Sequence, residues 1–339
     1  MNFREKFFWW KIGALTHDPP HKAWIIAKKV NWYTGIEERL QDVIRKKRLK
    51  GHAAAAYAIR ASIFSEEDVE KYLRNSAENL IHEADRLASA FDRWQISEVE
   101  KLSKKLFNVE EVYILNPLSG DVMYPEIPAC IGLKKFMETL RELRKIQDTK
   151  LKYHIFYAMY EPIFYDKVTR ISSPADRRSP THTVFDHLYA CASIVNWLCA
   201  DAKSMDENLK NKGECEGGLE PRGLFVRIEF VNVQDFMSRS RKLRDIWFSS
   251  WFASALMFRI LEKLIEDVGP DILIRPIARH NPFYYHMLLS RIEKDKNIPE
   301  NVKDELKRIA EKYAGLKAVS YTHLRAHETE ADLVCRLLL

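Results

Sequence analysis

The sequence predicts an α+β protein with a mostly helical first part and a smaller strand–helix–strand unit after it. Glycine and proline are scarce, 11 and 13 in 339 residues, which disfavours an all-β fold with many tight turns. Helical periodicity dominates the first two hundred residues, and after residue 221 the pattern changes to strand-like alternation. With 46% hydrophobic and 12% aromatic residues, the chain has the composition of a globular protein with a substantial core.

The first part reads as helical with one interruption. Ser65 precedes an acidic turn and is positioned to cap the helix that it opens. Between residues 106 and 131 a strand and turn break the pattern, which predicts an irregular insertion. The predicted helices cover residues 52–64, 65–75, 77–91, 133–146 and 185–201.

A polar stretch with three glycines, residues 203–221, is the best candidate for a domain boundary. After it we expect a strand over residues 223–231, a long helix over 240–267 and a second strand over 271–277. This order opens an α/β or ferredoxin-like unit. The two predicted domains are therefore residues 1–215 and 222–317.

The last residues, 318–339, do not fit either domain. They resemble a translated adapter or read-through segment fused to a truncated reading frame, and we set them aside as a non-native tail. The alternative is a genuine C-terminal helix.

Composition bears on three properties of the protein: its location, its use of cysteine and its charge. No run of about 18 apolar residues occurs and no signal peptide is evident, so we expect a cytoplasmic protein without a membrane partner. Five widely spaced cysteines without a Cys-x-x-Cys pair support neither a disulfide framework nor a structural zinc site. The net charge of +6 permits a nucleic-acid partner without requiring one.

The clearest local signal for chemistry is His17 next to Asp18, followed directly by two prolines. An imidazole nitrogen and a carboxylate oxygen can together bind one divalent metal ion. The prolines stop the preceding apolar helix and restrict the backbone, which favours a metal site. The alternative is a helix-end cap.

Three further segments offer ligands: His52 opens the alanine-rich helix, Asp85 has apolar neighbours, and His187 begins the last apolar helix. A buried carboxylate needs a cation or hydrogen bonds, and the alternative for Asp85 is a salt bridge to Arg86. His182 lies five residues before His187, so we expect only one of the two to point into a given site. Taken singly, each histidine is more often structural.

Together these residues form an ensemble that could hold one or two divalent metal ions. A metal pair can clamp the oxygens of a phosphoryl displacement. The ensemble therefore predicts hydrolysis of a phosphodiester or phosphomonoester.

Several motifs in one order resemble a known family, the large subunit of type III-B (Cmr) CRISPR effector complexes, also called the Cas-ten family, which acts in antiviral defence. The resemblance extends from the N-terminus to about residue 290. The motifs that carry it are residues 17–22, 84–93, 174–192, 241–251 and 280–284.

The resemblance implies that the first domain is a circularly permuted HD phosphohydrolase domain, a metal-dependent nuclease for single-stranded DNA. Mn, Ni, Co or Mg are the expected metal ions. Matched motif by motif, the implied metal ligands are His17, Asp18, His52, Asp85 and His187, of which His17 and Asp18 are also the implied catalytic residues.

The second domain resembles the first of two Palm domains, related to nucleotide cyclases and ferredoxin-like in fold. The family's cyclic-oligoadenylate site needs a Gly-Gly-Asp-Asp turn, which this chain lacks. We expect no synthesis of the second messenger by this chain, but ATP could meet a helix start there. The alternative is a solvated helix start. The candidate nucleotide-binding residues are Asn232, Gln234, Arg241 and Arg244.

Trp247 and Trp251 in the same region are four residues apart and are expected in the core.

The resemblance implies other Cmr subunits, a CRISPR guide RNA and its target RNA as partners. The main alternative is a catalytically degenerate scaffold that binds those subunits and the guide–target duplex. A weaker one is a phosphohydrolase of small nucleotides.

Overall fold

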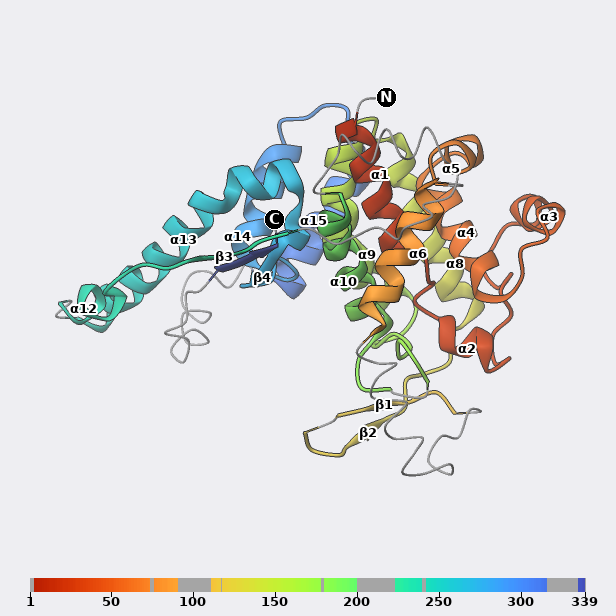
Figure 1. Cartoon of the computed structure of the whole chain (residues 1–339), viewed down its shortest axis with the longest axis horizontal. Helices are drawn as coiled ribbons and strands as arrows, with labels where there is room; N and C mark the ends of the chain where they lie inside the picture. Colours follow the sequence, from red (N-terminus) through yellow and green to blue (C-terminus); the bar gives the residue numbers. More distant parts are fainter. Residues whose placement is uncertain are drawn as a thin grey trace. The chain divides into compact units, whose positions relative to one another are not determined.

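The computed structural model describes residues 3–73, 76–90, 111–116, 118–177, 180–199, 223–239, 242–315 and 335–338 (Figure 1). The chain divides into two compact units. The first comprises Met1–Phe156 and Tyr160–Arg222, and the second comprises Tyr157–Met159 and Gly223–Leu339. The division near residue 222 lies next to the polar stretch 203–221, while the HD and Palm assignments stay predictions.

Helices make up most of the first unit. Those predicted from periodicity are present with ends shifted by a few residues. The helices are α1 (Phe3–Leu15), α2 (Lys22–Ile26), α3 (Glu38–Lys46), α4 (Gly51–Ile63), α5 (Glu66–Tyr72), α6 (Ser76–Ala88), α8 (Cys130–Glu142), the 3-10 turn η1 (Leu143–Lys145), α9 (Thr149–Lys167) and α10 (Val184–Leu198).

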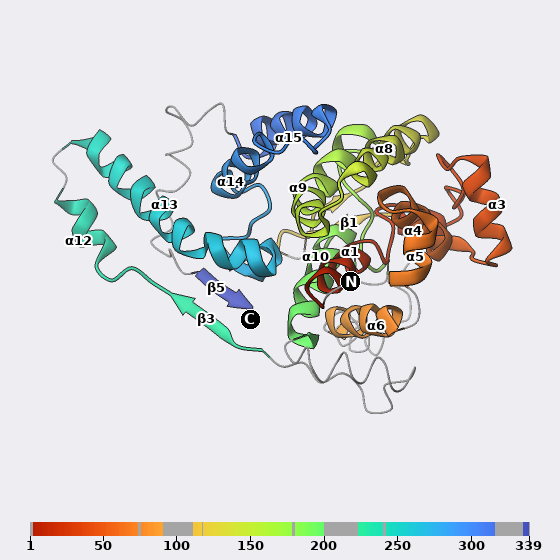
Figure 2. The same ribbon diagram turned by 90° about the horizontal axis from the view of Figure 1, so that it is seen from above.

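The core of this unit lies where α10 packs against α6 and α1, and α1 against α6 (Figure 2). Phe185 of α10 is fully buried, with its ring against those of Tyr160, Phe164 and Tyr165 on α9. Helix α4 contacts α2, α3 and α8. Its alanines 54–56 and 58 are buried, and their small side chains allow the neighbouring helices to pack closely.

Two details confirm or extend the predicted local structure. Ser65 caps α5, since its hydroxyl accepts from the backbone N–H of Asp68 at 3.0 Å. Within the predicted insertion, β1 (Ile114–Leu115) and β2 (Val122–Met123) form an antiparallel hairpin (Figure 1). Residues 91–110 lie outside the described part of the chain.

The second unit follows the predicted order of strand, long helix and strand, and then adds two helices. Its three-stranded sheet has the order β3-β5-β4 with antiparallel pairing throughout. The elements are β3 (Phe225–Ile228), α12 (Val233–Ser238), α13 (Leu243–Val268), the 3-10 turn η2 (Pro270–Ile272), β4 (Leu273–Arg275), α14 (Pro282–Ile292), α15 (Glu300–Tyr313) and β5 (Cys335–Leu338). Strand β5 comes from the segment set aside as a tail, whose non-native origin stays a prediction.

The expectation of a core position for the two α13 tryptophans is wrong. Trp251 is 41% exposed, and Trp247 is only partly buried. The rings of Trp251 and Phe252 are both near that of Phe248, which is 62% exposed. The four-residue spacing places the tryptophans on one face of the helix without indicating which face is covered.

No helix among the described ranges is both long and apolar enough to cross a membrane.

Candidate metal centre

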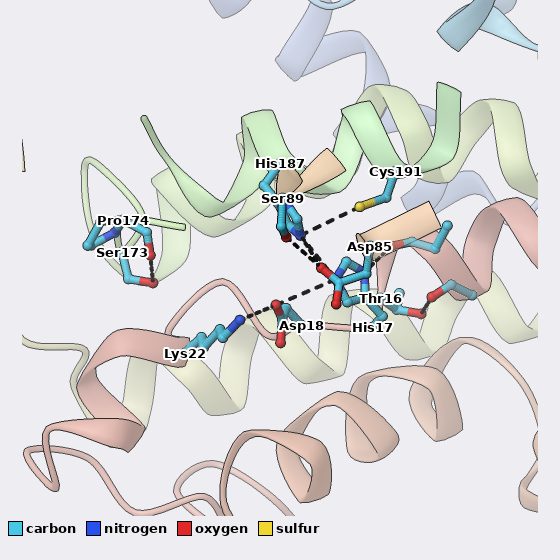
Figure 3. Close-up of polar contacts among 12 residues, drawn as sticks. Thr16, His17, Asp18, Lys22, Asp85, Ser89, Ser173, Pro174, His187 and Cys191 are labelled. Atoms are coloured by element: carbon cyan, nitrogen blue, oxygen red, sulfur yellow. Dashed lines mark hydrogen bonds and ion pairs between the residues drawn. The ribbon is translucent and has the colours of Figure 1, made fainter. Parts of the chain in front are cut away.

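Helices α6 and α10 and the end of α1 bring four potential metal ligands together. They are His17 just after α1, Asp85 of α6, and His187 and Cys191 of α10 (Figure 3). One ligand atom from each lies within 4.8 Å of those of the other three. The four residues come from three segments that are far apart in the sequence, so tertiary packing creates the cluster.

The end of α1 is held so that His17 faces the cluster. Thr16 donates its hydroxyl hydrogen to the carbonyl of Ile12, and Arg60 of α4 donates to the Thr16 hydroxyl and to the Gly13 carbonyl. His17 Nδ1 lies 2.7 Å from the Ala14 carbonyl oxygen. A carbonyl only accepts, so Nδ1 carries the proton and Nε2 remains free to act as a ligand.

Asp85 lies between the two histidines. Its Oδ1 is 3.0 Å from His187 Nε2 and 3.6 Å from His17 Nε2, and it accepts from the Ser89 hydroxyl at 3.1 Å. The alternative of a salt bridge to Arg86 is wrong. Arg86 turns outward and pairs with Glu83 on the same helix.

The start of α10 determines the position of His187. Thr183 and Asp186 form a reciprocal capping box there, so the helix begins one turn before His187. His187 is buried, and its Nε2 lies 3.3 Å from His17 Nε2. His182 precedes the helix and contacts Thr181 instead, so only one of the two histidines enters the cluster, as predicted.

The capping box yields a stability prediction. Thr183→Ala removes the side-chain acceptor at the helix start and is expected to lower the free energy of unfolding by about 1 kcal/mol. Urea unfolding followed by far-ultraviolet circular dichroism measures the loss. Thr181→Ala, two residues earlier and outside the box, is the matched control, and an equal loss in both variants would contradict the role of the cap.

Asp18 and His52 lie beside the cluster. Asp18 is buried; its Oδ2 is 3.5 Å from His17 Nε2 and 2.5 Å from Lys22 Nζ. His52, in the first turn of α4, is close enough to interact electrostatically with Asp18, Lys22 and His17. The predicted set is therefore gathered in one region, with Asp18 already paired to a lysine.

The two carboxylates of this region stay ionised. Burial acts to raise the pKa of Asp85, but hydrogen bonding and charge from His17 and His187 outweigh it and bring the pKa well below its ordinary value. For Asp18, burial is likewise outweighed by His17 and Lys22, and the pKa is lowered. Two ionised carboxylates in one buried region favour a cation.

The histidines and the cysteine respond to the same charges. Burial acts to lower the pKa of His17, yet Asp18 and Asp85 raise it above its ordinary value. Burial lowers the pKa of His52. Burial raises the pKa of the Cys191 thiol well above its usual range, and the charge of Asp85 adds to this.

The weaker nucleotide-site candidates lie in the second unit. Asn232, at the start of the six-residue helix α12, is exposed in a left-handed conformation with φ 61°. Gln234 and Arg244 are exposed as well, and Arg241 lies outside the described residues. Nucleotide binding at these residues stays a prediction.

Comparisons with known proteins indicate the family of the chain. It is 33% identical over 327 residues to the CRISPR system CMR subunit Cmr2 of Saccharolobus solfataricus, covering 92% of this chain and 27% of the relative. It is 25% identical over 352 residues to the Cmr subunit Cmr2 of Pyrococcus furiosus, covering 90% and 34%. The family described as "CRISPR-associated protein Cmr2, N-terminal" matches residues 225–330. The chain belongs to the Cmr2 family.

Structural comparison agrees with this assignment. A type III-B Cmr-beta structure in the apo state matches 97% of this chain at 30% identity and a TM-score of 0.66. The same type of complex bound to cognate target RNA matches 97% at 28% identity and a TM-score of 0.63. The chain thus corresponds to the N-terminal part of Cmr2, the large subunit, and spans about a third or less of the curated relatives' length. The metal-ligand cluster precedes residues 225–330.

Sequence reasoning missed three side chains of this region. Cys191, Lys22 and Ser89 each contact a predicted site residue four positions earlier: His187, Asp18 and Asp85. For Cys191 and Ser89 the signal that could have found them is helical spacing, because residues four apart share one face. Asp18 and Lys22 are joined by the non-helical stretch between α1 and α2, so their pairing has no such signal.

Proposed function

We propose that the cluster is a divalent-metal centre of the HD type and that it hydrolyses phosphodiester bonds in single-stranded DNA. The observation that carries this proposal is the convergence of His17 Nε2, His187 Nε2 and Asp85 Oδ1 at 3.0–3.6 Å from one another. Nitrogen and oxygen donors at such separations fit the first coordination shell of Mn, Co, Ni or Zn better than that of Mg, which prefers oxygen.

The surrounding residues fit a hydrolytic role. A divalent cation held here would supply Lewis-acid polarisation of a phosphoryl oxygen and a lowered pKa for a water molecule. Asp18, ionised and beside His17, can orient that water by accepting a hydrogen bond. The Lys22 ammonium, 23% exposed, can meet the negative charge of a phosphate.

We further propose that the chain works as part of a type III-B Cmr effector complex in antiviral defence, with other Cmr subunits, a guide RNA and a target RNA as partners. The similarity to Cmr-beta structures, one of them bound to cognate target RNA, supports this. The scaffold alternative shares these partners and differs only in lacking a working metal centre.

The nuclease proposal is tested by cleavage of an end-labelled single-stranded DNA with Mn²⁺ in the full chain. His17→Ala/Asp18→Ala is expected to abolish cleavage because it removes one ligand and the adjacent carboxylate. His82→Ala, on the exposed side of α6, is the control and is expected to cleave normally.

Two results would overturn the proposal. Cleavage that persists in the double variant would show that another site performs it. A wild-type chain that holds no divalent metal and leaves DNA intact would favour the scaffold alternative.

A further inference from the structure

We propose that residues 22–52, here called the basic segment, bind the phosphate backbone of single-stranded DNA and lead the strand to the metal centre. This inference rests on the proposed function and names the surface that holds the substrate of that function.

The basic segment carries the whole net charge of the chain. It contains nine lysine and arginine residues and three acidic residues, a net charge of +6, which equals the net charge of all 339 residues. The remaining residues are therefore neutral as a set. A surface on which charge of one sign is concentrated in this way attracts a polyanion.

Both ends of the basic segment lie at the metal centre. Lys22 opens the segment, with Nζ 2.5 Å from Asp18 Oδ2. His52 closes it and is close enough to Asp18 and His17 to interact with them electrostatically. Between these ends the chain forms α2 and α3 and returns through Lys50, the N-cap of α4. Helix α3 packs beside α4 at the edge of the first unit (Figures 1 and 2), so a strand bound along the segment is led toward the metal ligands.

Most of the positive charges of the segment are available to a ligand. Salt bridges occupy three of the nine basic side chains, those of Lys22, Arg45 and Lys47. The other six are exposed and form no salt bridge with any described residue: Lys28, Lys29, Arg39, Lys46, Arg48 and Lys50. Each of these can meet a phosphate group.

Two of the exposed basic residues occupy positions that favour glycine. Lys28 follows the cap of α2 with φ 57°, and Arg48 follows the cap of α3 with φ 58°. Both helices end in the same turn, in which the N–H of the left-handed residue bonds three residues back and the next N–H bonds five residues back. Glycine is usual at this position because a Cβ there is disfavoured. A long basic side chain at both ends therefore indicates a use that folding does not require.

An aromatic pair lies between these two turns in the sequence. The rings of Trp32 and Tyr33 meet edge to face with 5.6 Å between their centroids, and Tyr33 is 41% exposed. Aromatic side chains stack on unpaired bases, whose faces a duplex does not offer. Basic and aromatic side chains together therefore favour a single strand.

Binding without metal tests the inference independently of cleavage. The full chain in EDTA is titrated into fluorescently labelled oligo(dT), and anisotropy is recorded at several salt concentrations. Arg48→Gly/Lys50→Gln removes two phosphate contacts, so we expect binding to be roughly tenfold or more weaker at about 0.1 M salt, and the slope of log K against log salt to be shallower by about 1.4. With Mn²⁺, the variant is expected to raise the KM for cleavage and to keep kcat.

The matched control is Lys294→Gln/Lys296→Gln, which removes two exposed lysines from the second unit. It is expected to keep the affinity and the salt slope. Glycine suits the left-handed φ of residue 48, so Arg48→Gly alone is expected to unfold at the same or a higher urea concentration than wild type. Weaker DNA binding at undiminished stability separates a binding role from a structural one.

The outcomes distinguish this inference from the nuclease proposal. A wild-type chain that binds oligo(dT) no better than Arg48→Gly/Lys50→Gln, or an equal loss in the control, would overturn the inference. A loss confined to oligo(U) RNA or to phosphatidylserine vesicles would assign the segment to another anion and overturn it as well. Failure of the metal centre has a different signature, in which oligo(dT) is bound as expected and stays intact with Mn²⁺.

Discussion

Asp85→Asn is expected to lower the affinity of the chain for Mn²⁺ or Co²⁺ by roughly 100-fold or more and to bring cleavage of single-stranded DNA to background. The carboxylate lies between the two imidazoles, with Oδ1 within 3.6 Å of both Nε2 atoms. An amide of the same shape keeps the packing of α6 and removes the charge that draws in the cation.

Isothermal titration with Mn²⁺ measures this affinity, and Glu83→Gln provides the control. Glu83 is an acid on the same helix that pairs with Arg86, away from the cluster. The control is expected to bind metal normally. Undiminished binding by Asp85→Asn would show that the cation, if one binds, lies elsewhere.

Phe185→Ala is expected to lower the free energy of unfolding by about 3–5 kcal/mol, because it leaves a cavity at the centre of the first unit. The ring is fully buried and meets those of Tyr160, Phe164, Tyr165 and Tyr189. Urea unfolding followed by circular dichroism measures the loss.

Phe185→Leu is the graded control, since it keeps most of the apolar volume and is expected to cost about 1.5 kcal/mol or less. A loss of about 1.5 kcal/mol or less in both variants would mean that the site collapses around the missing ring and that the aromatic packing on α9 contributes little.

The fold was predictable from sequence where helices are amphipathic or clearly capped. Ser65 marks the start of α5, and the apolar run at 185–201 matches α10 closely. Helix α9 was not singled out, because it is apolar on nearly every side and contains Pro162. A helix that is buried on nearly all sides has no separate apolar and polar faces, so the spacing of its hydrophobic residues does not reveal it.

The site was predictable in its residue types and only partly in its arrangement. His17, Asp85 and His187 were all singled out, and the structure brings their ligand atoms together. The pairing of Asp18 with Lys22 depends on the course of the chain between α1 and α2, which a sequence pattern does not specify. The resemblance to a family supplied the order of the motifs and says nothing of a thiol.

The packing of α1 against α10 has a consequence for the growing chain. His17 and His187 are separated by 170 positions, and α1 is apolar along most of its length. Contacts so distant in sequence form late, after the cost of closing a long loop is met. During synthesis, the face of α1 that α10 covers therefore stays exposed until the ribosome has delivered α10, and for that interval it is a target for chaperones and a point of aggregation.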